Sequence, residues 1–163
     1  GLLWAGAWDG AYRVEGKRAV RQTDVDGTIT AFATTDAGLL AFGPEGTWRY
    51  ANQNWLPLDN DWSRHIRDAI VTGTGDLYIG TGVGLYRQRG KRLDHFYSDT
   101  DLYSGDIRSL AVDPKGDLWI GALGGIDVYS NGVYHKHLGP EEGLPNADVR
   151  AVAFDEDLSL IHI

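Results

Sequence analysis

Short stretches of alternating apolar and polar residues recur along the whole chain, and turns rich in glycine separate them. The clearest unit, residues 107–138, holds such stretches at 107–112, 118–120, 126–129 and 133–138. Alternation with a period of two, bounded by the turn sequences Asp-Pro-Lys-Gly, Gly-Gly and Ser-Asn-Gly, predicts β-strands. The unit is therefore expected to form a four-stranded antiparallel sheet.

The same pattern returns at a nearly constant interval. Units start at the glycines at positions 1, 38, 75 and 116, which are 37, 37 and 41 residues apart. A period near 40 residues with four strands per repeat is typical of the blades of a propeller. We therefore predict an all-β fold, a β-propeller of about four four-stranded blades over residues 1–157.

Both ends of the chain depart from the repeat. Residues 158–163 read Leu-Ser-Leu-Ile-His-Ile where the pattern requires another Gly-x-Leu-Trp-Ile-Gly, so we expect an aberrant, truncated C-terminus and assign it no function. The chain begins at the expected second strand of a blade and contains no methionine. We interpret it as an open, internal part of a larger propeller.

Three units place a large ring at one position of the second strand: Trp4, Tyr78 and Trp119. These rings could be platforms on which sugars stack, but packing between neighbouring blades is the simpler interpretation. In the second unit the sequence alignment puts Ala41 at this position, and we expect Trp48 and Trp55 to fill the gap.

The composition excludes several functions. The net charge of −8 and the pI near 4.9 are unsuited to neutralising phosphates, so we expect no nucleic-acid partner. The absence of cysteine excludes disulfides and thiolate zinc sites. No apolar run of about 18 residues is present, so the sequence predicts no membrane span.

Three segments carry a resemblance to a known family. Residues 75–85, 116–126 and the linker 139–150 resemble the two-component regulator propeller repeat. The resemblance implies an extracytoplasmic, periplasmic sensor region of a bacterial hybrid two-component regulator, histidine kinase or diguanylate cyclase. It also implies a parent chain that is homodimeric and that meets the membrane only through parts outside this sequence. We expect no cofactor.

The candidate ligand site lies on the face where the connections between blades emerge. Arg67, Arg108 and Arg150 recur as the second residue of the first strand, and we expect them to surround the channel mouth and hold an anionic group. The alternative is that each arginine pairs with a local acid, chosen from Asp68, Asp106 and Asp148.

The loops of this face are acidic and aromatic, which suits sugars, because rings stack on C–H faces and carboxylates accept hydroxyl protons. We therefore predict a small-molecule or oligosaccharide ligand near the three arginines. The predicted rim consists of Trp8, Trp62, Asp101, Tyr103 and Glu142.

No catalytic motif is evident, so the chain is predicted not to be an enzyme. His135 and His137 share a strand face, but no third metal ligand is evident. Two alternatives to a ligand sensor stay open. A protein-interaction scaffold would show a flat apolar patch, and a lyase or lactonase would need His, Glu and Asn converging at the axis.

Overall fold

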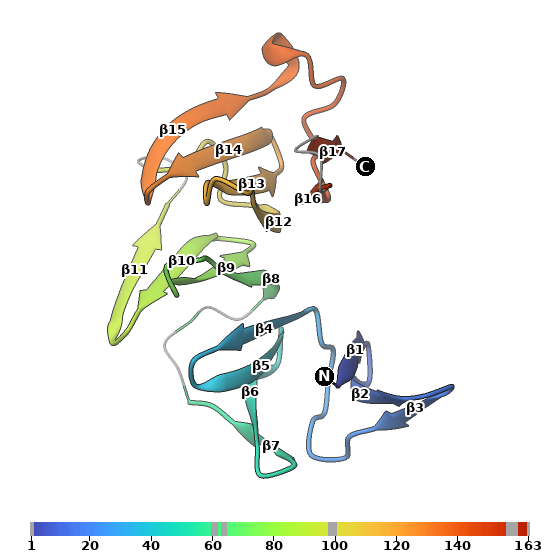
Figure 1. The fold of residues 1–163 in the computed structure, drawn as a ribbon. Coiled ribbons are helices and arrows are strands. Elements are labelled where there is room, and N and C mark those ends of the chain that lie inside the picture. The colour runs from blue at the N-terminus through green and yellow to red at the C-terminus, as the bar shows by residue number, and fades with distance from the viewer. Residues whose placement is uncertain (1, 60–61, 63–64, 98–100, 156–159, 163) are drawn as a thin grey trace.

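The computed structural model describes residues 2–59, 62, 65–97, 101–155 and 160–162. Within these residues every regular element is a strand, apart from the 3₁₀ turn η1 (Pro140–Glu142). The strands form separate antiparallel sheets that stand around a common centre (Figure 1). The predicted all-β propeller is confirmed. Among the described residues, no helix is long and apolar enough to cross a membrane.

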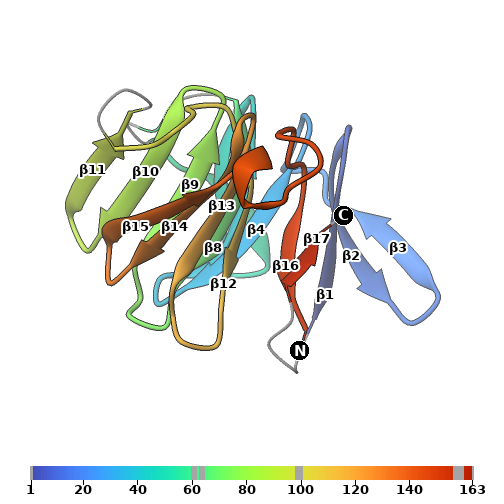
Figure 2. The same ribbon diagram turned by 90° about the horizontal axis from the view of Figure 1, so that it is seen from above.

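Three blades are complete, and in each the strands follow one another outward in chain order (Figures 1 and 2). The second blade consists of β4 (Ala31–Thr35), β5 (Gly38–Gly43), β6 (Gly46–Ala51) and β7 (Asn54–Pro57). The third consists of β8 (Ile66–Val71), β9 (Leu77–Thr81), β10 (Gly84–Arg89) and β11 (Arg92–Phe96). The fourth consists of β12 (Ile107–Val112), β13 (Leu118–Ala122), β14 (Gly125–Ser130) and β15 (Val133–Leu138).

The first and last sheets are smaller. The first blade has three strands, β1 (Leu3–Ala7), β2 (Gly10–Glu15) and β3 (Arg18–Arg21), which correspond to strands two to four of the other blades. The last sheet pairs β16 (Val152–Phe154) with β17 (Leu160–His162). Part of the predicted aberrant C-terminus is therefore in a strand, while residues 158, 159 and 163 lie outside the described residues.

The cores lie between blades. Each pair of neighbouring sheets shares one cluster of buried apolar side chains, such as the cluster of Leu85, Ile107 and Ile120 between the third and fourth blades. The three rings at the repeated position take part in these clusters. Tyr78 is 3% exposed, Trp4 packs edge-on against Trp55, and Trp119 packs edge-on against Phe154. The rings therefore serve packing between blades.

A glycine on the second strand lets neighbouring blades approach. A Cβ added at Gly80 would lie 2.5 Å from Ile107 Cγ2 on the next inner strand, and one at Gly121 would lie 2.8 Å from Val152 Cγ2. A Cβ at Gly6 would lie 2.6 Å from the Ile29 carbonyl oxygen. Real Cβ atoms do not approach other atoms so closely, so the spacing between blades requires these glycines.

The second blade corrects one expectation about the repeat. Gly43 pairs with Gly46 across the hairpin in the way that Thr81 pairs with Gly84. This register places Leu40, rather than Ala41, at the ring position. The alignment by first glycines failed by one residue because the β4–β5 turn is short, with Thr35 paired directly to Gly38. Ala41 is fully buried in one cluster with Trp48 and Trp55, as expected.

Candidate functional site

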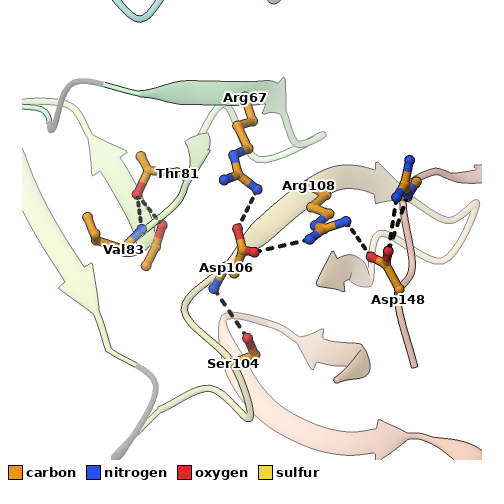
Figure 3. A network of polar contacts seen from close by, with 9 residues as sticks. Arg67, Thr81, Val83, Ser104, Asp106, Arg108 and Asp148 are labelled. Atoms are coloured by element: carbon orange, nitrogen blue, oxygen red, sulfur yellow. Dashed lines mark hydrogen bonds and ion pairs between the residues drawn. The ribbon is translucent and has the colours of Figure 1, made fainter. Parts of the chain in front are cut away.

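A chain of alternating arginine and aspartate side chains crosses three successive repeats (Figure 3). Arg67 donates to Asp106, and Arg108 donates to Asp148 and, at 3.2 Å, to Asp106. Arg150 donates to Asp148 at 3.3 Å. Each aspartate stands two residues before an arginine and joins that arginine to the one in the preceding repeat. We refer to these five residues as the Arg–Asp chain.

Irregular strand pairing positions two of the arginines. Along β8 and β9 the register passes from Ile66 opposite Thr81 directly to Asp68 opposite Gly80, so Arg67 has no partner on β9. The same shift occurs at Arg108 on β12. Such a bulge re-aims the side chain of the extra residue. Here it accompanies the convergence of both guanidinium groups on Asp106.

The three acids that we considered as local partners behave differently. Asp106 and Asp148 pair with arginines, whereas the carboxylate of Asp68 accepts hydrogen bonds from the backbone nitrogens of Leu110 at 2.7 Å and Ala69 at 2.8 Å. Burial raises the pKa of Asp68 above its ordinary value, and these hydrogen bonds partly oppose the rise. Asp68 thus joins two inner strands and takes no part in the Arg–Asp chain.

The Arg–Asp chain is interrupted between the second and third blades. Thr30 stands at the arginine position of the second blade, and His65 stands at the aspartate position of the third. The Thr30 hydroxyl donates to the Ile66 carbonyl oxygen at 2.8 Å. A hollow of about 390 Å³ opens at this interruption. It is lined by Thr30, Pro44, His65, Ile66, Arg67, Gly82 and Val83.

The hollow combines polar and apolar groups. The Arg67 side chain is 42% exposed and offers N–H donors beside the carboxylate of Asp106. His65 and Thr30 add an imidazole and a hydroxyl, and Val83, which is 58% exposed, adds an apolar surface. A hydroxyl group can accept from the guanidinium and donate to the carboxylate, whereas an anion would compete with Asp106 for Arg67. The arrangement suits hydroxyl-rich molecules.

Two of the predicted rim residues belong to packing contacts. Trp62 packs against Phe42, with 5.7 Å between ring centroids, beside the cluster that joins the second and third blades. Tyr103 is 64% exposed, and its ring stacks on His137 at 3.9 Å.

The other predicted rim residues lie in turns. Glu142 accepts a hydrogen bond from the Gly139 backbone nitrogen at 2.8 Å, and Asp101 accepts one from the Tyr97 nitrogen at 3.4 Å. Trp8 is 81% exposed on the β1–β2 turn. The structure thus brings the three arginines together through Asp106 and Asp148, while Glu142 and Asp101 accept hydrogen bonds within their own turns.

The two histidines on β15 have different surroundings. His135 is exposed, whereas Nδ1 of His137 lies 2.8 Å from the buried carboxylate of Asp127. That carboxylate also accepts from the Tyr103 backbone nitrogen at 2.9 Å. Asp127 stands where the other blades have an aromatic residue, and it ties the loop before β12 to the fourth blade. In the described part of the chain, no three potential metal ligands gather.

Sequence reasoning missed most of the hollow. Pro44, Gly82 and Val83 belong to two-residue hairpin turns and carry no motif. The available signal was the pair Thr30 and His65, which replaces an arginine and an aspartate of the repeat. Reading it required knowledge that the arginine of one blade pairs with the aspartate of the next.

Several solved structures share the fold. The extracellular domain of a proposed one-component system from B. thetaiotaomicron has a TM-score of 0.81 and 20% identity, over 96% of this chain and 23% of that one. That of a proposed hybrid two-component system from the same organism has a TM-score of 0.81 and 16% identity, over 98% and 24%. PorZ, a surface component of the type-IX secretion system of Porphyromonas gingivalis, has a TM-score of 0.69 and 19% identity, over 95% and 28%.

These structures fit the resemblance seen in the sequence, since two of them are extracellular domains of signalling proteins. The chain spans about a quarter of the length of each. Propellers with other functions match as well, among them the WD40 domain of Doa1 with 14% identity and an inactive virginiamycin B lyase from Staphylococcus aureus with 12% identity. No family model and no curated protein matches the chain.

Proposed function

We propose that this chain is part of the extracytoplasmic, ligand-sensing propeller of a bacterial signal-transduction protein of the two-component kind. The likeness to extracellular domains of such proteins supports the class. The observation that carries ligand binding is the hollow at the interruption of the Arg–Asp chain. There a half-exposed guanidinium, a carboxylate and an imidazole stand beside an apolar surface.

The proposed ligand is a carbohydrate. Sugars present hydroxyl groups that both donate and accept, together with C–H faces that pack on apolar side chains, and the hollow offers counterparts for each. Neutral sugars suit the hollow best, because the carboxylate of Asp106 beside Arg67 would repel an anionic sugar and compete with it for the guanidinium. We propose that the ligand is bound without chemical change, as in a sensor.

The test is a calorimetric titration of the chain with a panel of neutral and uronate-containing oligosaccharides. Arg67→Gln and Thr30→Arg should each weaken binding by about tenfold or more, the first by removing donors and the second by filling the hollow. His135→Ala, on the exposed outer strand, is the control and should bind as the parent does. Equal loss in all three variants, or no loss in Thr30→Arg, would place the ligand elsewhere.

A protein-interaction scaffold is the second candidate. Three of the turns that join the second and third strands of a blade carry an exposed apolar residue: Trp8, Val83 and Leu123 are 81%, 58% and 49% exposed. A partner covering this face would bury all three. Binding of oligosaccharide that is unaffected by Trp8→Ser and Leu123→Ser would favour the sensor over the scaffold.

A further inference from the structure

A second cavity, of about 420 Å³, lies between the second and third blades and shares no lining residue with the hollow. The second blade and the connection after β7 contribute Thr35, Asp36, Ala37, Leu40, Arg49, Leu58, Asp59 and Trp62. The third blade contributes Gly75, Leu77, Gln88 and Gly90. Its floor is apolar, and among the described lining residues Arg49 is the one with a cationic side chain.

The cavity lies where the second blade lacks a large ring. The other three blades place Trp4, Tyr78 or Trp119 at the position of Leu40, as the strand pairing shows. Those rings pack into the clusters between blades. Leucine is much smaller than tyrosine or tryptophan, so the equivalent space beside Leu40 is not filled by the blade itself.

The cavity also lies where an arginine lacks its carboxylate. Arg49 is equivalent to Arg87, which forms an ion pair with Asp94 across the strands at 2.6 Å. Opposite Arg49, however, the outer strand carries Leu56. Arg49 has no ion pair with any residue that the structure describes, and its Nε atom is buried without a hydrogen-bond partner. A buried donor of a charged group is costly to leave without an acceptor.

The third blade therefore contains two groups that the second blade lacks at equivalent places, a ring and a carboxylate. We propose that this cavity binds a small aromatic molecule with one carboxylate group. The ring occupies the space beside Leu40 and packs against Leu58, Trp62 and Leu77, and the carboxylate accepts hydrogen bonds from Arg49. Asp36 and Asp59 in the lining repel a second negative charge, which restricts the ligand to a monocarboxylate.

The probe that tests this site is indole-3-acetate, with indole-3-acetamide as its neutral counterpart. In calorimetric titrations of the chain, the acetate should bind, and the acetamide should bind at least about tenfold more weakly, because a charge-assisted hydrogen bond is lost. Arg49→Gln should abolish this preference. Arg18→Gln, the same change at an exposed arginine of the first blade, is the matched control and should retain it. Equal affinity for acetate and acetamide in the parent chain would overturn the proposal.

Two further variants rebuild the arrangement of the third blade inside the second. Leu40→Trp supplies the missing ring, and Leu56→Asp supplies the missing carboxylate opposite Arg49. Each should reduce binding of indole-3-acetate by about tenfold or more, because the protein itself then occupies the place of the ligand. A melting temperature equal to or above that of the parent confirms that each variant folds. Undiminished binding in folded Leu40→Trp would refute the site. Neither variant touches the hollow, so the carbohydrate proposal is tested separately.

Discussion

Equivalent positions in different blades share one backbone environment, so a difference in local structure between two such positions reflects their side chains. Thr30 and His65 stand where neighbouring repeats have an arginine and an aspartate, and a hollow replaces the ion pair. Leu40 stands where other blades have a ring, and a cavity replaces it. Both openings lie at the boundary between the second and third blades. Two single departures from the repeat thus each accompany an opening between blades.

Asp76 provides a prediction about pH. Its carboxylate is nearly buried and accepts hydrogen bonds from Arg89 at 2.8 Å and 3.0 Å, and these hold its pKa below the ordinary value of 3.8. A lowered pKa in the folded state means that the stabilisation is present above pH 4 and is lost as the pH falls through the folded value. Asp76→Asn should therefore lower the free energy of unfolding by about 1–2 kcal/mol at pH 7.

Urea unfolding at pH 7 and again near pH 2 measures this effect, and the difference between parent and variant should disappear at the lower pH. Asp117→Asn, at the equivalent position of the fourth blade, is the control and should change little at either pH. A deficit of Asp76→Asn that persists undiminished in acid would contradict an ionic origin.

At the scale of strands, the glycine of the second strand sets the distance between blades. Gly80→Ala would bring a Cβ within 2.5 Å of Ile107 Cγ2, so the third and fourth blades must separate or Ile107 must move. We expect a loss of about 1–3 kcal/mol in the free energy of unfolding, as for other overpacked cores. Gly73→Ala is the control and should be nearly neutral in thermal unfolding, because a Cβ added there has no atom within 4 Å beyond its chain neighbours. Equal melting temperatures for the two variants would disprove the role of Gly80.

The strands could be predicted closely because their signals are local. The stretches 107–112 and 133–138, predicted as strands, form β12 and β15 with these bounds. The register of β5 could not be predicted, because it depends on the length of the turn before it. The three arginines were recognised as a set, but Thr30 and His65 come together only in the lining of the hollow between two blades, and no local pattern records that proximity.

At the scale of the whole molecule, the free edge of the first blade leads to a prediction. Within the described residues β1 pairs only with β2, so its other edge carries unpaired backbone groups, and Leu3 and the preceding Leu2 are 65% and 59% exposed. Unprotected edges of this kind pair with other chains. We expect the chain to self-associate at micromolar concentrations.

Sedimentation velocity would detect this self-association. Leu3→Lys, which places a charge on the edge, should shift the distribution toward monomer, whereas Val133→Lys, at the equally exposed start of β15, should not. A monodisperse monomer in the parent chain would show that the edge is protected.

The apolar cores lie between the blades rather than within them. The stability of the chain therefore depends on contacts between neighbouring blades, as in a one-dimensional array. Each blade is stabilised through the junctions with its neighbours, so the free energy of folding is approximately a sum over nearest neighbours, and the molecule can open at its weakest junction while the others persist. Both openings described above lie at the single junction between the second and third blades. A molecule bound in either one therefore strengthens that one link, and it changes how the two halves of the array hold together without altering any blade.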